Sequence, residues 1–171
     1  MARRKATRTQ RKTLLVVGEG HTEVAFLNYL KTLYCRGSGS VHVKVDNAHG
    51  KGPENVVDTA LRVRRRGQYD KVAAVLDTDI PWTDLLKRLA RTEEVELIGN
   101  TPCIEALFLR VMGVAPPADT EACKTAAASA ITHDLLDKNT YSNWCAPARL
   151  ERLCVEDEGL ARLVRLYRGE D

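Results

Sequence analysis

The stretch Thr13-Leu-Leu-Val-Val-Gly-Glu-Gly-His21 contains an apolar run, a glycine break and the start of a helix. The run 13–17 has no polar alternation, which is typical of a strand buried on both faces. Apolar residues at helical spacing then predict an amphipathic helix over residues 21–34. A buried strand followed by a helix is the unit from which parallel sheets are built.

The alternation of a strand with a helix continues for three more strands and three more helices before residue 113, without an internal sequence repeat. Alternation of Val41, Val43 and Val45 with polar residues predicts a half-exposed edge strand, and Pro53 is well placed to begin the helix that follows. The further expected elements are strands at 71–76 and 94–98 and helices at 53–66, 81–90 and 102–112. We therefore predict an α/β fold with a four-stranded, mainly parallel sheet flanked by helices.

The strand signal disappears after Pro116-Pro117, where the sequence predicts helices over residues 122–136 and 147–167. The predicted organisation is a basic arm at 1–12, an α/β domain at 13–113 and a helical C-terminal extension at 114–171, packed on that domain.

Length and charge limit the function classes. The chain has 171 residues, 44% of them hydrophobic, which is the composition of one globular domain. The net charge of +3 hides an asymmetry, because residues 1–12 hold six cations and no acid. We expect a disordered arm that contacts nucleic acid or an acidic partner, or that only improves solubility. Its cations are Arg3, Arg4, Lys5, Arg8, Arg11 and Lys12.

The sequence gives no sign of export or of a membrane partner. No apolar run approaches the ~20 residues that cross a bilayer, and the first residues lack the apolar segment of a secretory signal. Five cysteines without a Cys-x-x-Cys pair argue against a zinc site and a disulfide framework. We expect a cytoplasmic protein.

Carboxylates follow two of the predicted strands. Glu19 ends the first strand, Asp77 and Asp79 end the third, and ligands of parallel α/β sheets bind at the carboxyl ends of strands. Glu23 and Glu105 lie in the first turns of the following helices, where an acid either stabilises the helix dipole or binds a cation. The Asp-Thr-Asp segment is either a turn or, with both acids on one side, a site for a hard ion such as Mg²⁺ or Mn²⁺.

These residues carry a resemblance to a known family. Leu15-Val-Val-Gly-Glu-Gly-His-Thr-Glu23, Val75-Leu-Asp-Thr-Asp79 and Ile98-Gly-Asn-Thr-Pro-Cys-Ile-Glu105 resemble the TOPRIM domain. More narrowly they resemble RloB-like proteins, which are close in layout to the nuclease domain of OLD-family proteins. The resemblance covers about residues 13–112.

The resemblance implies metal-dependent phosphodiester hydrolysis with two Mg²⁺ or Mn²⁺ ions, a mechanism in which the ions clamp the attacking and leaving oxygens. By position, Glu19 is implied as a ligand or general acid/base and Asp77 as a catalytic ligand. The implied metal-binding residues are Glu19, Glu23, Asp77, Asp79 and Glu105. Anti-phage defence is a further implication, while a partner ATPase and a homodimer stay open.

Nucleic acid is the expected partner. Arg64, Arg65 and Arg66, together with the arm, could hold a phosphate backbone without reading sequence, or they form a solvated helix face. Only 5% of residues are aromatic, which argues against a base-stacking platform.

Two other functions are weighed against a nuclease. A non-cleaving TOPRIM-like module would recruit nucleic acid or a partner; in its favour, Leu107 and Val111 stand where RloB-like proteins have tryptophan and histidine. A haloacid-dehalogenase phosphatase also places Asp-x-Asp after a strand, but Pro81 stands where it needs threonine.

Overall fold

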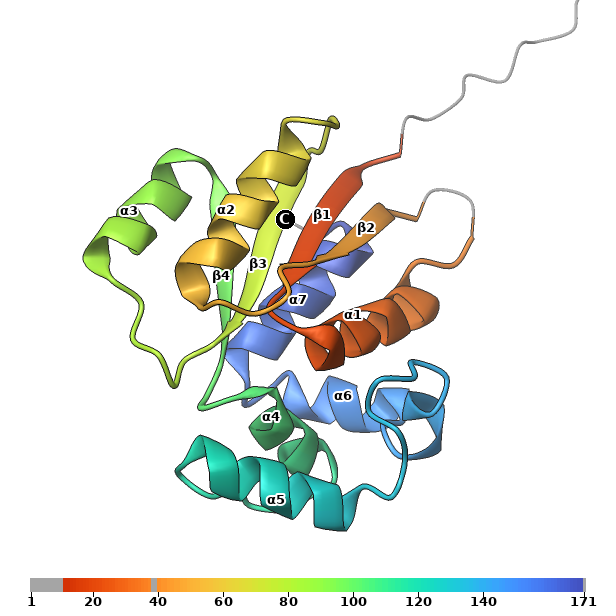
Figure 1. Cartoon of the computed structure of the whole chain (residues 1–171). Coiled ribbons are helices and arrows are strands. Elements are labelled where there is room, and N and C mark those ends of the chain that lie inside the picture. Colours follow the sequence, from red (N-terminus) through yellow and green to blue (C-terminus); the bar gives the residue numbers. More distant parts are fainter. Residues whose placement is uncertain (1–10, 38–39, 171) are drawn as a thin grey trace, which may run out of the picture.

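The computed structural model describes residues 11–37 and 40–170, and within them it contains one parallel sheet of four strands (Figure 1). The strand order is β2-β1-β3-β4, and every neighbouring pair is parallel. The bounds are β1 (Thr13–Gly18), β2 (His42–Asn47), β3 (Lys71–Asp77) and β4 (Val95–Asn100). The predicted α/β class, the four strands and the edge position of β2 are confirmed.

Helices cover both faces of the sheet, as Figure 1 shows. The helices α1 (His21–Tyr34) and α7 (Glu158–Arg168) pack on one face, and α2 (Pro53–Arg64) and α3 (Asp84–Thr92) pack on the other. Successive residues of a strand point to opposite faces, so Leu14 and Val16 join the first cluster while Leu15 and Val17 join the second. This explains why the first strand is apolar at every position.

Three further helices lie beyond the carboxyl end of the sheet: α4 (Ile104–Val111), α5 (Thr120–Ala130) and α6 (Pro147–Leu153), with a 3₁₀ turn at Tyr141–Asn143 (Figure 1). Buried tyrosines form hydrogen bonds to helix α1 or from it. The Tyr29 hydroxyl of α1 donates to Cys145 O, just before α6, at 2.5 Å, and the Tyr167 hydroxyl of α7 donates to Leu27 O of α1 at 3.0 Å. The C-terminal residues thus share one apolar core with the sheet, and α7 is itself one of its covering layers.

The single helix predicted over 147–167 is wrong, because it is two helices, α6 and α7, separated by a turn. Asp157 causes the separation: its Oδ1 accepts from Leu160 N at 2.8 Å and so caps α7. Its Oδ2 accepts from Arg110 Nη2 at 3.0 Å. Both bonds hold Asp157 in an extended conformation that a continuous helix would not permit.

Two other helix predictions differ at their ends. Helix α5 stops at Ala130 rather than residue 136, since Asp134 forms a turn in which its Oδ1 accepts from Leu136 N at 2.8 Å. Helix α3 begins at Asp84 rather than at 81, because the hydroxyl of Thr83 accepts from Leu86 N and supplies the cap. Local side-chain bonds to the backbone decide both boundaries.

The basic arm falls mostly outside the described residues, which begin at 11; Arg3, Arg4, Lys5 and Arg8 are among those left out. Lys12 is part of the ordered body at the amino end of β1: its Nζ donates to Gly169 O at 2.9 Å, and its carbonyl accepts from His42 N. Across residues 11–37 and 40–170, no helix has both the length and the apolar composition needed to cross a bilayer.

Replacing the α7 cap tests this account of the C-terminal helices. Asp157→Ala removes the cap and the Arg110 ion pair, and it should lower the free energy of unfolding by about 1–3 kcal/mol. Asp157→Asn keeps a capping oxygen and should lose less. Urea unfolding measures both; equal stability of Asp157→Ala and the unmodified chain would show that the cap does not hold α7.

Candidate functional site

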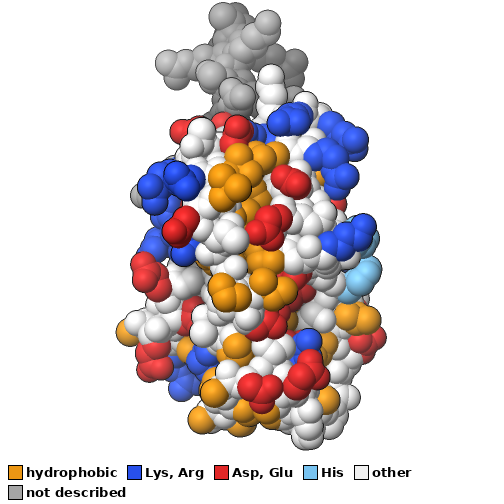
Figure 2. Space-filling model, turned by 60° about the vertical axis from the view of Figure 1, so that its left-hand side comes forward, with side chains coloured by type: hydrophobic (Ala, Val, Ile, Leu, Met, Phe, Trp, Pro, Cys, Tyr) orange, Lys and Arg blue, Asp and Glu red, His pale blue; other side chains and the backbone are white. Residues whose placement is uncertain are grey.

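The predicted acids are positioned by the carboxyl ends of β1 and β3. Gly18 at the end of β1 pairs with Val75, and Asp77 at the end of β3 pairs with Asn100. Glu19, next along the chain, therefore lies beside Asp77, whose N–H donates to Glu19 Oε2 at 3.3 Å. On the face shown in Figure 2, acidic side chains are spread among hydrophobic and basic ones, and one group of them lies just below the middle.

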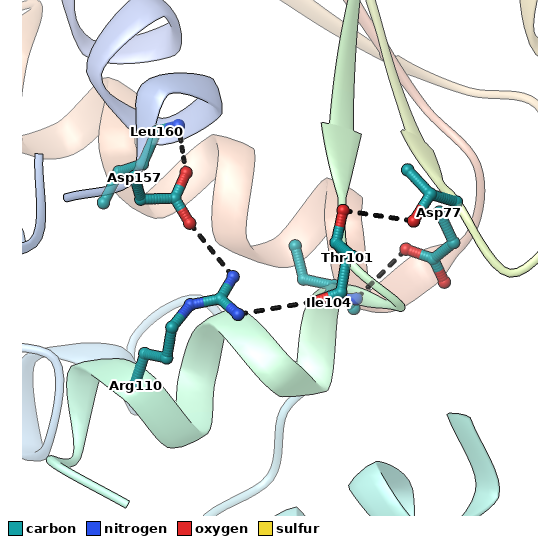
Figure 3. A network of polar contacts seen from close by, with 7 residues as sticks. Asp77, Thr101, Ile104, Arg110, Asp157 and Leu160 are labelled. Atoms are coloured by element: carbon teal, nitrogen blue, oxygen red, sulfur yellow. Dashed lines mark hydrogen bonds and ion pairs between the residues drawn. The ribbon is translucent and has the colours of Figure 1, made fainter. Parts of the chain in front are cut away.

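Asp77 is the centre of this carboxylate cluster, which consists of Glu19, Glu23, Asp77, Asp79 and Glu105. Its Oδ1 accepts from Ile104 N at 3.0 Å, at the first residue of α4 (Figure 3). Burial and then the negative charges of Glu23, Glu19, Glu105 and Asp79 raise the pKa of Asp77 to about 8. The other four acids therefore all lie within electrostatic reach of Asp77, as the strand-end argument predicts.

Glu23 is buried and has a structural role of its own. Its Oε2 accepts from Gly20 N at 2.9 Å, which closes the first turn of α1. Burial raises the pKa of Glu23 most, and the charges of Glu105 and Glu19 add to the effect, while backbone hydrogen bonds oppose it. The helix-capping role and the place in the cluster thus belong to the same side chain.

Asp79 stands at the rim of the cluster. Strand β3 ends at Asp77, so the alternation predicted to put the two aspartates on one side does not extend to Asp79. Its Oδ1 accepts from Ile80 N at 2.8 Å, and its Oδ2 accepts from Thr120 Oγ1 at 3.1 Å. Asp79 therefore forms a turn and also connects β3 to the start of α5.

Two buried polar atoms of this region have no hydrogen-bond partner among the described residues: Glu105 Oε2 and Asn100 Nδ2. Asn100 is only 7% exposed. A buried donor or acceptor without a partner costs about 1–3 kcal/mol, and such atoms in native proteins call for a water, ion or ligand. From the sequence, Asn100 was expected at a strand end but was not counted among the candidate site residues. Its position at a strand end was the feature that could have identified it.

Helix α5 supplies a cation that the sequence could not place. Burial lowers the pKa of Lys124, but the charges of Glu105 and Glu121 outweigh it, so the pKa is raised. Lys124 therefore lies in the field of Glu105, while its ion pair is with Glu121 on the same helix, at 3.6 Å. Lys51 borders the other side, in a loop that Gly50 N ties to Glu19 O at 2.8 Å.

The predicted nucleic-acid contacts lie at the opposite edge of the sheet. Helix α2 returns antiparallel to the strands, so Arg64, Arg65 and Arg66 at its end lie near the amino ends of the strands. Arg64 is bound to the carbonyl and carboxylate of Glu93. A strand of six residues spans roughly 20 Å, which separates these three arginines from the carboxylate cluster.

The cluster suits a divalent cation by chemistry, although it is not preassembled around one. Its ligands are oxygens only, the set that Mg²⁺ and Mn²⁺ prefer, and Glu105 Oε2 is an acceptor without a donor. Across the described ranges, no three His, Cys, Asp or Glu side chains are grouped to hold an ion as they stand. Some carboxylates must therefore turn toward a bound ion.

Comparison of the chain with models of known families, with curated proteins and with solved structures gave no match. The assignment of the site rests on its geometry and electrostatics.

The raised pKa of Asp77 makes stability depend on pH. An unfolded aspartate ionises near pH 3.9 and Asp77 near pH 8, so between these values the folded chain binds the extra proton. The free energy of unfolding should fall as pH rises through this window, by up to about 1.4 kcal/mol per pH unit from this group. Asp77→Asn keeps the acceptor for Ile104 N and should flatten the curve.

Urea unfolding in EDTA between pH 5 and pH 9, as a range chosen around this window, measures the effect. Asp84→Asn is the matched control, because the Asp84 side chain is 92% exposed on α3 and should follow the unmodified chain. Parallel curves for all three proteins would contradict the crowding of charge around Asp77.

Proposed function

We propose that this chain is a cytoplasmic, Mg²⁺- or Mn²⁺-dependent nuclease of the TOPRIM and RloB-like kind that hydrolyses phosphodiester bonds. The observation that carries the proposal is the carboxylate cluster, crowded enough to raise the pKa of Asp77 to about 8. An uncompensated group of like charges destabilises the fold, and a divalent cation would compensate it.

Glu19, Asp77 and Glu105 are the proposed inner ligands, with Glu23 and Asp79 at the sides. Bound ions would polarise the phosphoryl oxygen and lower the pKa of the attacking water. Five carboxylates suffice to neutralise about two divalent ions, the number that two-metal hydrolysis uses. Glu19, whose carboxylate lies beside Asp77 at the strand end, would act as an ion ligand or, in the alternative, as the proton acceptor for the attacking water.

The charge that develops on the phosphate needs a cation near the cluster. Lys124 meets this need best, because Glu105 acts on its charge and its helix is joined to Asp79 through Thr120. In the proposal Lys124 contacts the phosphate from the α5 side.

A non-cleaving nucleic-acid-binding module is the second candidate. It is favoured by the structural use of two of the acids, since Glu23 closes the first turn of α1 and Asp79 is bound on both oxygens. Such a module, with or without a partner ATPase, would keep the fold and the cations but would not cut.

Cleavage assays separate the two functions. Purified protein should cut at least one of labelled single-stranded or double-stranded DNA or RNA in Mg²⁺ or Mn²⁺, and none in EDTA. Asp77→Asn and Glu105→Gln should each lower the rate by roughly 100-fold or more, which corresponds to about 2.7 kcal/mol of transition-state stabilisation. Asp84→Asn should cut normally. Binding without cleavage of any probe would favour the binding module.

Metal binding has a readout that does not need activity. An ion that binds only the folded chain stabilises it by about 2.7 kcal/mol at a hundredfold excess over Kd. Mn²⁺ or Mg²⁺ should therefore raise the melting temperature of the unmodified chain and of Asp84→Asn, but not that of Asp77→Asn. A melting temperature indifferent to millimolar metal would rule out the nuclease.

A further inference from the structure

A groove lined with arginines begins close to the carboxylate cluster. Two adjoining surface cavities, of about 370 and 410 Å³, share Arg110, Leu153 and Glu156. The first extends between α4 and α6, and the second reaches Thr101 after β4. We call the pair the α4–α6 groove. Its principal lining residues are Arg110, Met112, Arg149, Arg152, Leu153 and Glu156.

Arg110 connects the groove to the cluster. Its Nη1 donates to Thr101 O at 3.3 Å and its Nη2 to Asp157 at 3.0 Å (Figure 3). Thr101 in turn is hydrogen-bonded through its hydroxyl to that of Thr78 at 3.1 Å, and Thr78 follows Asp77 directly. A chain of contacts thus leads from the guanidinium to the strand end where the acids gather.

Arg149 and Arg152 bring positive charge that the described residues leave unpaired. Arg149 Nη1 donates to Trp144 O at 3.3 Å and to the sulfur of Met112, which are both neutral acceptors. Neither arginine forms an ion pair with a carboxylate in the described ranges. Glu156 is the one acid that lines the first cavity, where both arginines lie. The second cavity adds Asp157, which is paired with Arg110, and Glu158, so the net positive charge of the groove is confined to the first cavity.

We propose that the α4–α6 groove binds the phosphate backbone of the nucleic acid through Arg149 and Arg152; that this strand is the substrate of the carboxylate cluster rests on the proposed function. Guanidinium groups match phosphate oxygens in a paired geometry, and grip on the backbone reads no sequence. The groove also lies at the same edge of the sheet as the carboxylate cluster. Arg64, Arg65 and Arg66, in contrast, lie at the opposite edge.

Glu156 provides a second test of phosphate binding, because a carboxylate inside the groove would repel a phosphate. Glu156→Gln should therefore tighten binding, whereas loss of an arginine should weaken it. Opposite effects from neighbouring residues are expected of a phosphate contact and not of a surface that the nucleic acid never meets.

Salt dependence of binding, read by fluorescence anisotropy on labelled duplex and single-stranded probes, tests the groove. The measurements use the full chain carrying Asp77→Asn, so that the probes stay intact. Adding Arg149→Gln and Arg152→Gln should lower the slope of log K against log salt by about 1.8 on duplex or about 1.4 on a single strand, at about 0.9 or 0.7 per phosphate contact.

The matched control is Arg65→Gln with Arg66→Gln, which removes the same charge from the opposite edge and should leave the slope unchanged. Arg152→Gln alone should remove about half of the effect. The fold does not depend on its guanidinium, because within the described residues the Arg152 side chain forms no hydrogen bond or ion pair, and its carbonyl, which accepts from Val155 N, is kept in the variant. This variant should therefore fold normally. An unchanged slope in the Arg149/Arg152 variant, or an equal loss in the control, would overturn the groove.

The outcomes also separate the groove from the nuclease. A reduced slope in the Arg149/Arg152 variant, with no cleavage by the unmodified chain, would support phosphate binding by the groove and contradict the nuclease function. An unchanged slope together with metal-dependent cleavage would contradict phosphate binding by the groove and support the nuclease function. A chain that binds none of the probes would overturn both.

Discussion

Asp77 lies among four other carboxylates at the end of a buried strand, and the elements around it have to accommodate that negative charge. The N-terminus of α4 meets it with the Ile104 N–H at 3.0 Å, where the helix dipole favours an anion. Burial and the neighbouring acids nevertheless raise the pKa of Asp77 to about 8. A site that destabilises the fold in this way is typical of function rather than of packing.

Two polar contacts, beside the shared apolar core, fix the position of the C-terminal helices. Thr120 at the start of α5 binds Asp79 at 3.1 Å, and Asp157 at the start of α7 binds Arg110 at 3.0 Å. These contacts place Lys124 on one side of the carboxylate cluster and the α4–α6 groove on another. Segments that sequence analysis treated as an extension therefore complete the walls of the site, and α7 also covers the sheet.

The convergence of Glu19, Asp77 and Glu105 could be predicted from the sequence, because strand ends in a parallel sheet meet at one edge. Local side-chain bonds could not be predicted in the same way: Asp157 divides one predicted helix into two, and Asp79 turns toward α5. The groove was missed because residues 110, 149 and 152 come together only through tertiary packing of helices far apart in the sequence. Charge density alone pointed instead to the arm, which lies mostly outside the described residues, and to Arg64–Arg66, which lie at the other edge of the sheet.

The central claim is that the carboxylate cluster holds a divalent cation, and anomalous diffraction from crystals soaked in Mn²⁺ tests it most directly. The account predicts an anomalous peak bounded by Glu19, Asp77 and Glu105, with the Glu105 carboxylate, whose Oε2 has no partner among the described residues, turned toward the ion. Well-ordered density for these side chains with no peak between them at saturating Mn²⁺, or a peak only elsewhere on the chain, would contradict it.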